Sequence, residues 1–455
     1  METEDKRAVL IVAMLSAFLL PFTATSLNVA LPQMGSDLAA DSVLLGWIVT
    51  AFILSAAMFL VPIGRIADMH GRKRIFKIGA WIFAVTSLLI ALASSPWVVI
   101  ALRALQGFGG AMISGNSAAM LASVYPARER GRVLGIYVGT VYSGQSVGPV
   151  FGGFLTQHFG WRSIFAVIAL LAIATACITT WKLKSETDAV RDERFDITGS
   201  TVYCMTVFAL TYGLSVLPAP HGFAYLAAGA VGLVTFVHRQ NNIPHPILQV
   251  SLFRDNTVFA LSNLAALLNY GAFFAVGFLL SLYLQFVKGL SPQDTGLILL
   301  SQPVVMAVSS PLAGRLSDRI EPRMLASAGM ALTCLGLLVL ASLDAESSLW
   351  LVVVTLLVHG LGFGLFSSPN TNAVMGAVGE KLYGVASGIM STMRVMGQIL
   401  SMSICMLIIA NFIGRVQLTS EHAAQLIQAS RVTFLIFAVM CLGGIVASMA
   451  RGNLH

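Results

Sequence analysis

The sequence predicts an all-α membrane protein with about fourteen membrane-spanning helices. Of its 455 residues, 57% are hydrophobic and 10% are charged, and the mean hydropathy is +0.83. Soluble domains carry roughly 25% charged residues, so this chain has too few charges to cover a water-facing surface. Long apolar runs recur along the chain, each close to the roughly 20 residues that a helix needs to cross about 30 Å of hydrocarbon.

The apolar runs are too long for the strands of a membrane barrel, which alternate apolar and polar residues over about ten positions. We therefore expect helices near residues 8–31, 43–63, 75–94, 97–121, 132–156, 161–181, 197–217, 222–237, 257–284, 294–313, 324–343, 349–375, 384–410 and 430–450.

The composition also excludes several function classes. The first apolar run is too long for the h-region of a signal peptide, so the first helix is expected to remain. The five cysteines fall within predicted spans and form no Cys-x-x-Cys pair, which favours small hydrophobic side chains over a disulfide or metal site. No G-x-x-x-x-G-K-[ST] phosphate loop occurs, and no nucleophile constellation is evident. We expect no ATP hydrolysis, no cofactor, no metal and no enzyme activity.

The basic residues predict the orientation in the membrane. With both termini placed inside, the outside segments hold Arg162, Lys288, Arg415 and Arg431, two arginines lie within spans, and the remaining 21 of the 27 Lys and Arg lie inside. Cytoplasmic loops carry such an excess. The net charge of +7 is therefore a topology signal, and we expect no nucleic-acid partner.

Two predicted inside loops resemble each other at an offset of 250 residues: GRIADMHGRKR at 64–74 and GRLSDRIEPR at 314–323. Glycine allows helices to approach closely, aspartate can cap a helix or pair with arginine, and basic residues hold a loop inside. The repeat indicates two duplicated halves, a common plan for transporters with a site between the halves. The candidate gating residues of these loops are Gly64, Asp68, Gly71, Arg72, Arg74, Gly314 and Asp318.

These features resemble the major facilitator superfamily. Residues 64–74 are similar to its signature loop between helices 2 and 3, and LRALQGFGGA at 102–111 resembles its helix 4 motif, with Arg103 as the motif arginine. With fourteen helices, the chain is most similar to the drug:proton antiporter-2 family. The resemblance implies two six-helix bundles, residues 1–184 and 251–455, with two inserted transmembrane helices in 185–250.

The fifth predicted helix resembles the motif associated with antiporters in that superfamily. Its motif residues are Gly144, Gly148, Pro149, Gly152 and Gly153. The glycines that recur every four or five residues are expected to form one flat stripe that lets helices pack backbone to backbone, and Pro149 supplies a bend. The stripe consists of Gly135, Gly139, Gly144, Gly148 and Gly152. The stripe serves either static packing or a gate-controlling interface.

Ionisable side chains inside spans are costly and mark functional candidates. Arg103, His359 and Arg394 lie within predicted spans, whereas none of the 20 Asp and Glu residues falls in the middle of one. Many members of the resembled family carry an aspartate in helix 1, and alignment on residues 28–32 places Thr23 there. We take Arg103, His359, Arg394 and Thr23 as coupling candidates. With two buried arginines and no buried acid, the cavity is expected to prefer neutral or anionic amphiphiles.

The resemblance implies a cavity between the halves. Its candidate lining residues combine aromatic and amide side chains, which suits a broad amphiphile pocket: Asn28, Asn116, Tyr142, Gln145, Asn269, Tyr270, Phe274, Asn370 and Asn372. The sequence thus predicts a monomeric plasma-membrane exporter of small amphiphilic substrates, exchanging them for protons by alternating access in the lipid bilayer. The alternatives are a proton-independent uniporter or lipid transporter, and a non-transporting receptor or scaffold.

Overall fold

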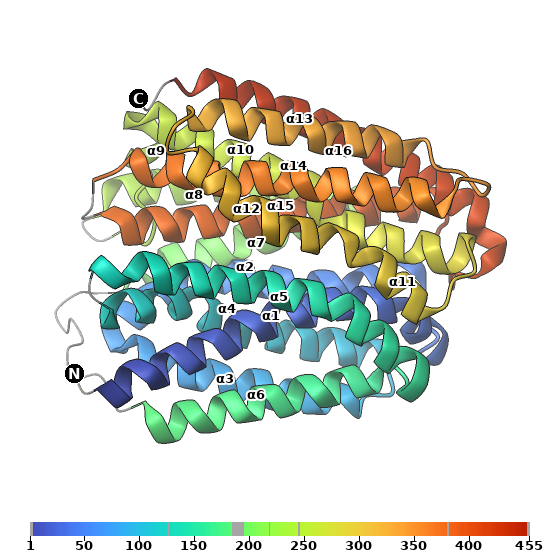
Figure 1. Cartoon of the computed structure of the whole chain (residues 1–455), viewed down its shortest axis with the longest axis horizontal. Helices are drawn as coiled ribbons and strands as arrows, with labels where there is room; N and C mark the ends of the chain where they lie inside the picture. The colour runs from blue at the N-terminus through green and yellow to red at the C-terminus, as the bar shows by residue number, and fades with distance from the viewer. Residues whose placement is uncertain are drawn as a thin grey trace.

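The computed structural model describes residues 3–125, 127–183, 195–217, 219–243, 246–379 and 382–452. Every regular element within these ranges is helical, which confirms the all-α prediction. The first half of the chain is drawn from blue to green in Figure 1. It contains α1 (Thr3–Asp37), α2 (Ser42–His70), α3 (Arg72–Ala91), α4 (Pro96–Val124), α5 (Ala127–Phe159) and α6 (Arg162–Lys182).

The second half follows an inserted hairpin of two helices, α7 (Ile197–Val216) and α8 (Pro220–Asn242). It begins with the short α9 (Ser251–Asp255). Some of its spans combine two consecutive elements, so that its elements form six spans. Its elements are α10 (Thr257–Leu282), the π-helical η1 (Tyr283–Val287), α11 (Pro292–Leu299), α12 (Ser301–Leu316), α13 (Pro322–Ala341), α14 (Leu349–Gly376), α15 (Tyr383–Phe412), the 3-10 turn η3 (Ser420–His422) and α16 (Ala423–Ala450).

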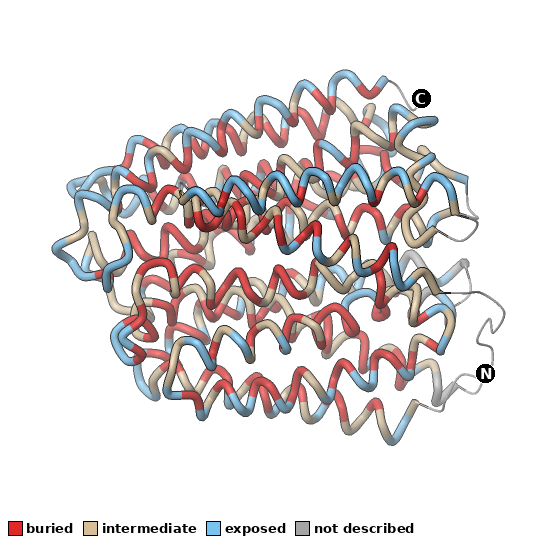
Figure 2. Tube along the Cα trace, turned by 180° about the vertical axis from the view of Figure 1, so that it is seen from behind, coloured by how far each residue is buried: buried red, intermediate tan, exposed pale blue. Residues whose placement is uncertain are grey.

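Thirteen segments of the described chain are long and apolar enough to cross a membrane. The fourteenth predicted span, 132–156, corresponds to α5, a 33-residue helix that packs along α1. This helix is less apolar than the other spans because it is rich in glycine and polar residues. Buried and exposed stretches alternate along the helices in Figure 2, as expected when one face packs inside and the other meets lipid. The predicted domain boundaries stay a prediction, and the one at 184/185 lies outside the described residues.

Both termini lie at the same end of the bundle (Figure 1), here called the terminal end, and the opposite end is the distal end. Tight connections keep neighbouring helices antiparallel. Asp41 caps α2 by accepting a bond from Leu44 N at 2.8 Å, and Gly71 alone separates α2 from α3 with a φ of 94° that favours glycine.

The same helix crossing occurs in both halves. A Cβ added at Gly79 of α3 would lie 2.9 Å from the carbonyl oxygen of Gly109 in α4. In the second half, a Cβ at Gly329 of α13 would lie 2.5 Å from the carbonyl oxygen of Gly362 in α14. Gly79 and Gly329 differ by the same 250 residues as the repeated loops, so the duplication extends beyond the loops into the packing of the helices.

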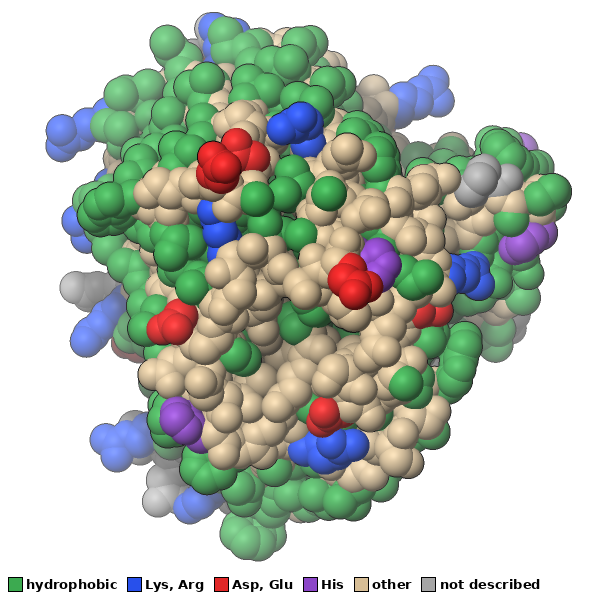
Figure 3. Space-filling view, turned by 90° about the vertical axis from the view of Figure 1, so that its right-hand side faces the viewer, with side chains coloured by type: hydrophobic (Ala, Val, Ile, Leu, Met, Phe, Trp, Pro, Cys, Tyr) green, Lys and Arg blue, Asp and Glu red, His purple; other side chains and the backbone are tan. Residues whose placement is uncertain are grey.

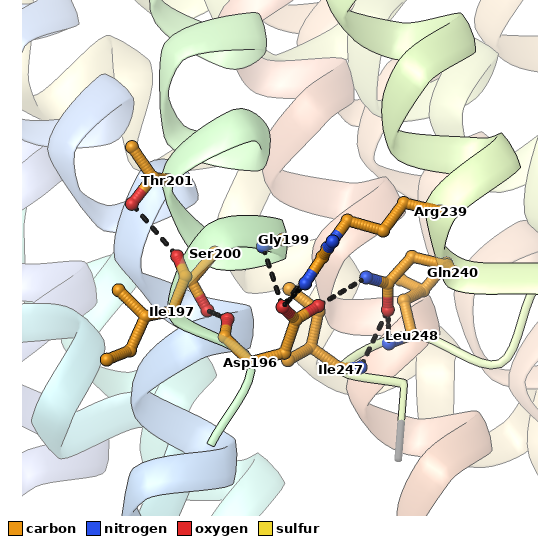
Figure 4. Close-up of polar contacts among 9 residues, drawn as sticks. All are labelled: Asp196, Ile197, Gly199, Ser200, Thr201, Arg239, Gln240, Ile247 and Leu248. Carbon is orange, nitrogen blue, oxygen red and sulfur yellow. Dashed lines mark hydrogen bonds and ion pairs between the residues drawn. The ribbon is translucent and has the colours of Figure 1, made fainter. Parts of the chain in front are cut away.

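A polar cluster ties the two inserted helices together at the terminal end (Figure 4). Asp196 caps α7 through Gly199 N and accepts bonds from Arg239 and Gln240 of α8 at 2.8 and 3.0 Å. Burial alone would raise the pKa of Asp196, but the bonds from Arg239, Gly199 N and Gln240 outweigh it and hold this pKa below its usual range.

Replacing Asp196 by asparagine is expected to keep the helix cap but remove the ion pair with Arg239. Because Arg239 is partly exposed, the loss should destabilise the hairpin by only about 1 kcal/mol. Asp196→Ala also removes the cap and is expected to cost about 1 kcal/mol more. Because the folded pKa of Asp196 is lowered, its ionised form stabilises the fold above roughly pH 4, and this stability is lost as pH falls through the lowered pKa. Thermal unfolding should therefore separate wild type from Asp196→Asn at pH 7, and the gap should close in acid. A gap that widens in acid would contradict this.

Candidate functional site

The two halves touch by close backbone contact between α5 and α11 at the distal end. Gly153 of α5 lies against the Pro292 carbonyl of α11, and Gly296 of α11 lies against the Pro149 carbonyl of α5. A side chain at either glycine would collide with the facing backbone. The antiporter-motif segment therefore forms part of the contact between the halves.

Further distal contacts join α1 to α10 and η1, and join α2 to α15 and the segment that follows it. Ser281 Oγ donates to the Asn28 carbonyl at 2.7 Å, and Gln285 Nε2 donates to the Val29 carbonyl at 3.0 Å. Thr50 Oγ1 lies 3.2 Å from Met406 Sδ, and Ser42 N donates to the Val416 carbonyl at 2.9 Å. Figure 3 looks onto this distal end, where scattered charged side chains lie among backbone and apolar groups. The halves are closed against each other here.

The helix faces that touch at the distal end lie apart at the terminal end. Residues eighteen positions apart lie on one helix face, about five turns or 27 Å from each other. Gly46 of α2 meets Met406 of α15, yet at Gly64 on the same face an added Cβ would have no heavy atom of the described residues within 4 Å. The same holds for Gly388, eighteen residues before Met406, and for Gly135, eighteen residues before Gly153. The structure is thus closed distally and open at the terminal end.

Aromatic and polar side chains from both halves meet midway between the two ends. Tyr142 OH of α5 donates to Ser310 Oγ of α12 at 3.1 Å. Tyr142 also packs with the side chains that we name the central cluster, formed by Tyr142, Tyr270, Phe273, Met306 and Phe363. The Phe273 and Phe363 rings lie 4.0 Å apart, and Tyr270 meets Phe363 edge-on at 5.1 Å. The cluster lies between the closed region and the open region.

Arg394 of α15 brings a positive charge to this cluster. Its guanidinium lies 5.5 Å from the Tyr270 ring centre, within cation–π range, and it donates to Thr371 Oγ1 at 3.0 Å. The buried Arg394 Nε and the buried Gln145 Oε1 of α5 have no hydrogen-bond partner among the described residues. One unpartnered donor and one unpartnered acceptor thus come from opposite halves. No Asp or Glu lies in the middle of a described span to neutralise the arginine.

His359 lies inside the second half, fully buried. Its ring stacks on Phe273 with centroids 4.9 Å apart, and Nδ1 is 3.1 Å from Gln302 Nε2. His359 Nε2 has no partner among the described residues. Through Phe273 the imidazole touches the central cluster, which makes His359 the titratable coupling candidate nearest to it.

Arg103 and Thr23 are engaged within the first half. Arg103 Nε donates to the Ile48 carbonyl at 3.1 Å and its NH1 to Gln106 Oε1 at 2.6 Å, while its guanidinium stacks over Phe52 at 4.5 Å. Thr23 Oγ1 donates to the Leu19 carbonyl of its own helix at 2.7 Å. Arg103 thus links α4 to α2, the Thr23 bond stays within α1, and neither side chain contacts the central cluster in these bonds.

The expectation of one five-glycine stripe along α5 was wrong. Gly144, Gly148 and Gly152 pack on α1, where an added Cβ at Gly152 would lie 2.7 Å from Ser26 Cα. At Gly135 and Gly139 an added Cβ would meet no other part of the described chain within 4 Å. The five-residue step from Gly139 to Gly144 turns the helix by about 140°, so the two groups face different directions.

The first signature loop is mostly helix, contrary to its interpretation as a loop. Residues 64–70 belong to α2, and Asp68 pairs with Arg72 across the Gly71 break at 2.8 Å. Arg74 is exposed on α3. In the second half, Gly314 packs against Ser368 of α14, and the exposed Asp318 lies in the turn after α12.

Several cavity candidates bind neighbouring helices instead. Asn370 Nδ2 donates to the Ser262 carbonyl at 3.1 Å, and Asn372 Nδ2 donates to Ser317 Oγ at 2.6 Å. Asn116 donates to Met112 of its own helix, and the Asn28 carbonyl belongs to the distal contact. The buried Asn269 side chain has no partner among the described residues, and Phe274 packs at the edge of the main core.

Sequence reasoning missed residues that the structure brings to these places. Phe273, Met306 and Phe363 looked like ordinary lipid-facing or core side chains, because nothing in a one-dimensional pattern tells which helix face meets the other half. Arg451 was counted as an inside charge, yet it is 2% exposed and donates to Asn370 Oδ1 at 2.8 Å. Burial lowers the pKa of Arg451 to about 10.

The family model of the Major Facilitator Superfamily matches residues 13–291 and again 262–452. The chain belongs to the major facilitator superfamily. It is therefore a multi-pass membrane transporter and not an enzyme.

Curated relatives extend the similarity along most of the chain. It is 34% identical over 405 residues to the multidrug resistance protein Stp of Mycobacterium tuberculosis, covering 87% of this chain and 74% of that protein. It is 30% identical to the methylenomycin A resistance protein of Bacillus subtilis, covering 88% and 87%. It is 27% identical to the riboflavin transporter RibZ of Clostridioides difficile, covering 98% and 97%.

A solved structure shares the fold. The inward-facing, unoccupied structure of a bacterial homolog of the human lysosomal transporter Spinster has a TM-score of 0.71 and 16% identity, covering 99% of this chain and 98% of that one. This likeness confirms the major facilitator fold, with two six-helix bundles and two additional helices.

Proposed function

We propose that this transporter is a secondary active exporter of small amphiphilic compounds that works by alternating access. The observation that carries the proposal is the central cluster, which joins Tyr142 of one half to Ser310 of the other at the point where the halves part. A substrate bound there is reached from the terminal end and is shielded by the distal contacts. Relatives named for multidrug and methylenomycin A resistance support export of such compounds.

The proposed substrates are neutral or anionic. Arg394 supplies a charge and a buried, unpartnered Nε, Gln145 supplies an unpartnered acceptor, and the aromatic rings supply flat apolar walls. A buried cation without a neighbouring acid disfavours a cationic ligand by several kcal/mol at short range. A relative named a riboflavin transporter supports a substrate that is flat and not cationic.

We place the protein in the plasma membrane as a monomer, with the terminal end in the cytoplasm. The charge asymmetry of its loops supports this orientation. Opening at the terminal end then corresponds to an inward-open state, in which substrate enters from the cytoplasm.

Proton antiport is proposed with His359 as the group that titrates, because its stacked ring contacts Phe273 of the central cluster. A second candidate is proton-independent uniport or lipid movement. Thr23 stands at the position of the family aspartate, and its hydroxyl is engaged by a bond within its own helix. This favours the second candidate.

Transport in proteoliposomes with an imposed pH gradient tests the proposal. A panel of neutral, anionic and cationic amphiphiles should show net flux of the first two, driven by the gradient in wild type. Replacing His359 by alanine should abolish the response to the gradient but leave downhill exchange. Flux that ignores the gradient in wild type would establish the proton-independent alternative, and absence of flux for every compound would refute export.

Asp68→Asn is expected to slow transport severalfold while leaving the fold intact. The Asp68–Arg72 pair is exposed, and such pairs contribute about 0–1 kcal/mol to stability. In the closed state of the terminal end, the carboxylate would meet helix starts or arginines of neighbouring elements. Asp37→Asn is the matched control, because Asp37 makes an exposed pair with Arg162 at 3.5 Å at the distal end. Unchanged transport in Asp68→Asn would remove Asp68 from the mechanism.

A further inference from the structure

A groove of about 710 Å³ lies on the outer side of the first half, between that half and the inserted hairpin. Its walls come from α2, α4, α7 and α8. They are lined mainly by large apolar side chains, among them Met58, Phe59, Phe108, Met205 and Phe208. The groove is separate from the central cluster and from the contacts between the halves.

The floor of the groove is formed where α7 docks on a proline of α2. Pro62 has no N–H, so the Met58 carbonyl lacks its usual helical donor. Cys204 Sγ of α7 donates to this carbonyl at 3.1 Å, and Tyr203 OH donates to the neighbouring Ala57 carbonyl at 3.1 Å. The inserted helix thereby satisfies the backbone at the α2 bend, which fixes the floor.

Hydroxyl groups in the walls are also engaged. Ser200 Oγ donates to the Asp196 carbonyl at 2.8 Å, and Thr201 Oγ1 donates to the Ile197 carbonyl at 2.9 Å. The groove therefore suits a mainly apolar ligand, and the Tyr225 hydroxyl is the one other hydroxyl group among the described residues of its lining.

The depth of the groove matches one leaflet of a bilayer. It runs along α7 from Ile197 to Ala209, about 18 Å at 1.5 Å per residue, and half of the hydrocarbon core is roughly 15 Å. All four walls belong to helices that are long and apolar enough to span a membrane. Ile197 and Met205 remain 69% and 66% exposed at the opening, so the groove is continuous with the surface that faces lipid.

We propose that this groove is a binding site for one acyl chain of a phospholipid from the leaflet at the terminal end. Such a chain has the length, the shape and the lack of polar atoms that the groove requires. Within a bilayer the gain on binding comes from packing of the chain against the fixed walls. The bound lipid fills the space between α2 and the hairpin and holds the two together.

Photo-crosslinking in nanodiscs tests the proposal. The full chain is reconstituted in phosphatidylethanolamine and phosphatidylglycerol, with a fraction of the lipid carrying a diazirine in one acyl chain, and labelled residues are mapped by mass spectrometry. Met58, Cys204 and Met205 should be labelled severalfold more than Val439 and Val446, which are 66% and 68% exposed on α16. Excess transport substrate should not reduce the labelling.

Two neighbouring alanines of α8 provide matched variants. Ala228 lines the groove, whereas the adjacent exposed Ala227 lies outside its lining. Ala228→Trp should lower groove labelling severalfold, because the indole would occupy part of the groove, and Ala227→Trp should leave it unchanged. Equal labelling of the groove and the α16 face, equal effects of the two variants, or competition by substrate would each overturn the proposal.

Discussion

Replacing Gly296 by alanine is expected to reduce transport by about tenfold or more. An added Cβ would press on the Pro149 carbonyl of the other half, and the main chain on both sides cannot give way as a flexible side chain could. Overpacking of this kind costs about 1–3 kcal/mol. Because this contact belongs to the distally closed state, the cost shifts the equilibrium between states by roughly 5- to 150-fold.

Hydrogen exchange distinguishes this shift from simple damage to the fold. In Gly296→Ala, amides of α5 around Gly135 and of α15 around Gly388 should exchange more slowly, because the terminal end spends more time closed. Gly443→Ala is the control, since its nearest neighbour, Leu268 Cδ1, would lie at an ordinary 3.6 Å. Wild-type transport in Gly296→Ala, or faster exchange at the terminal end, would show that the distal contact does not control the states.

Removing the charge of Arg394 is expected to have the second large effect. Arg394→Gln should lower kcat/KM for an anionic substrate by about 10- to 100-fold, because hydrogen bonds to charged groups contribute roughly 1.5–3 kcal/mol. Arg394→Lys keeps the charge but loses the planar donor. Its kcat/KM should therefore lie between those of wild type and Arg394→Gln. Initial rates of uptake into inverted proteoliposomes measure this effect.

Comparison with Arg103 distinguishes a substrate-binding role of Arg394 from a structural role. Its guanidinium contacts Ile48, Gln106 and Phe52 of its own half, so Arg103→Gln should lower the melting temperature. Arg394→Gln should leave the melting temperature nearly unchanged, because its guanidinium is partly buried beside Tyr270 and Thr371. If both variants lost stability and neither changed substrate preference, Arg394 would be a packing residue.

The helices and their repeat were predictable because each span must be long and apolar, whatever its neighbours are. The offset of 250 residues between Gly64 and Gly314 predicted the duplication that Gly79 and Gly329 show again in the packing. Helix ends were less predictable. Asp68 looked like a loop residue, yet α2 continues to His70, since the single Gly71 with positive φ is enough to reverse the chain.

The site was predictable in part, for a reason of geometry. Tyr142, Tyr270 and Arg394 stood out as polar or aromatic side chains in apolar runs, and the structure brings them together. Asn370 and Asn372 stood out equally, but their amides bind Ser262 and Ser317 of neighbouring helices. An amide side chain within a span forms hydrogen bonds with whichever helix it faces. Which helix that is depends on the rotation of each helix about its axis, and the sequence alone does not give this rotation.

A pair of amphiphiles with the same aromatic body tests the central claim most directly. One carries a carboxylate and the other a quaternary ammonium group, and their transport is measured in proteoliposomes with wild type and Arg394→Gln. The central cluster with its unopposed Arg394 predicts transport of the carboxylate compound, weak or absent transport of the cation, and loss of this preference in Arg394→Gln. Efficient transport of the cation alone, unchanged by Arg394→Gln, would contradict it.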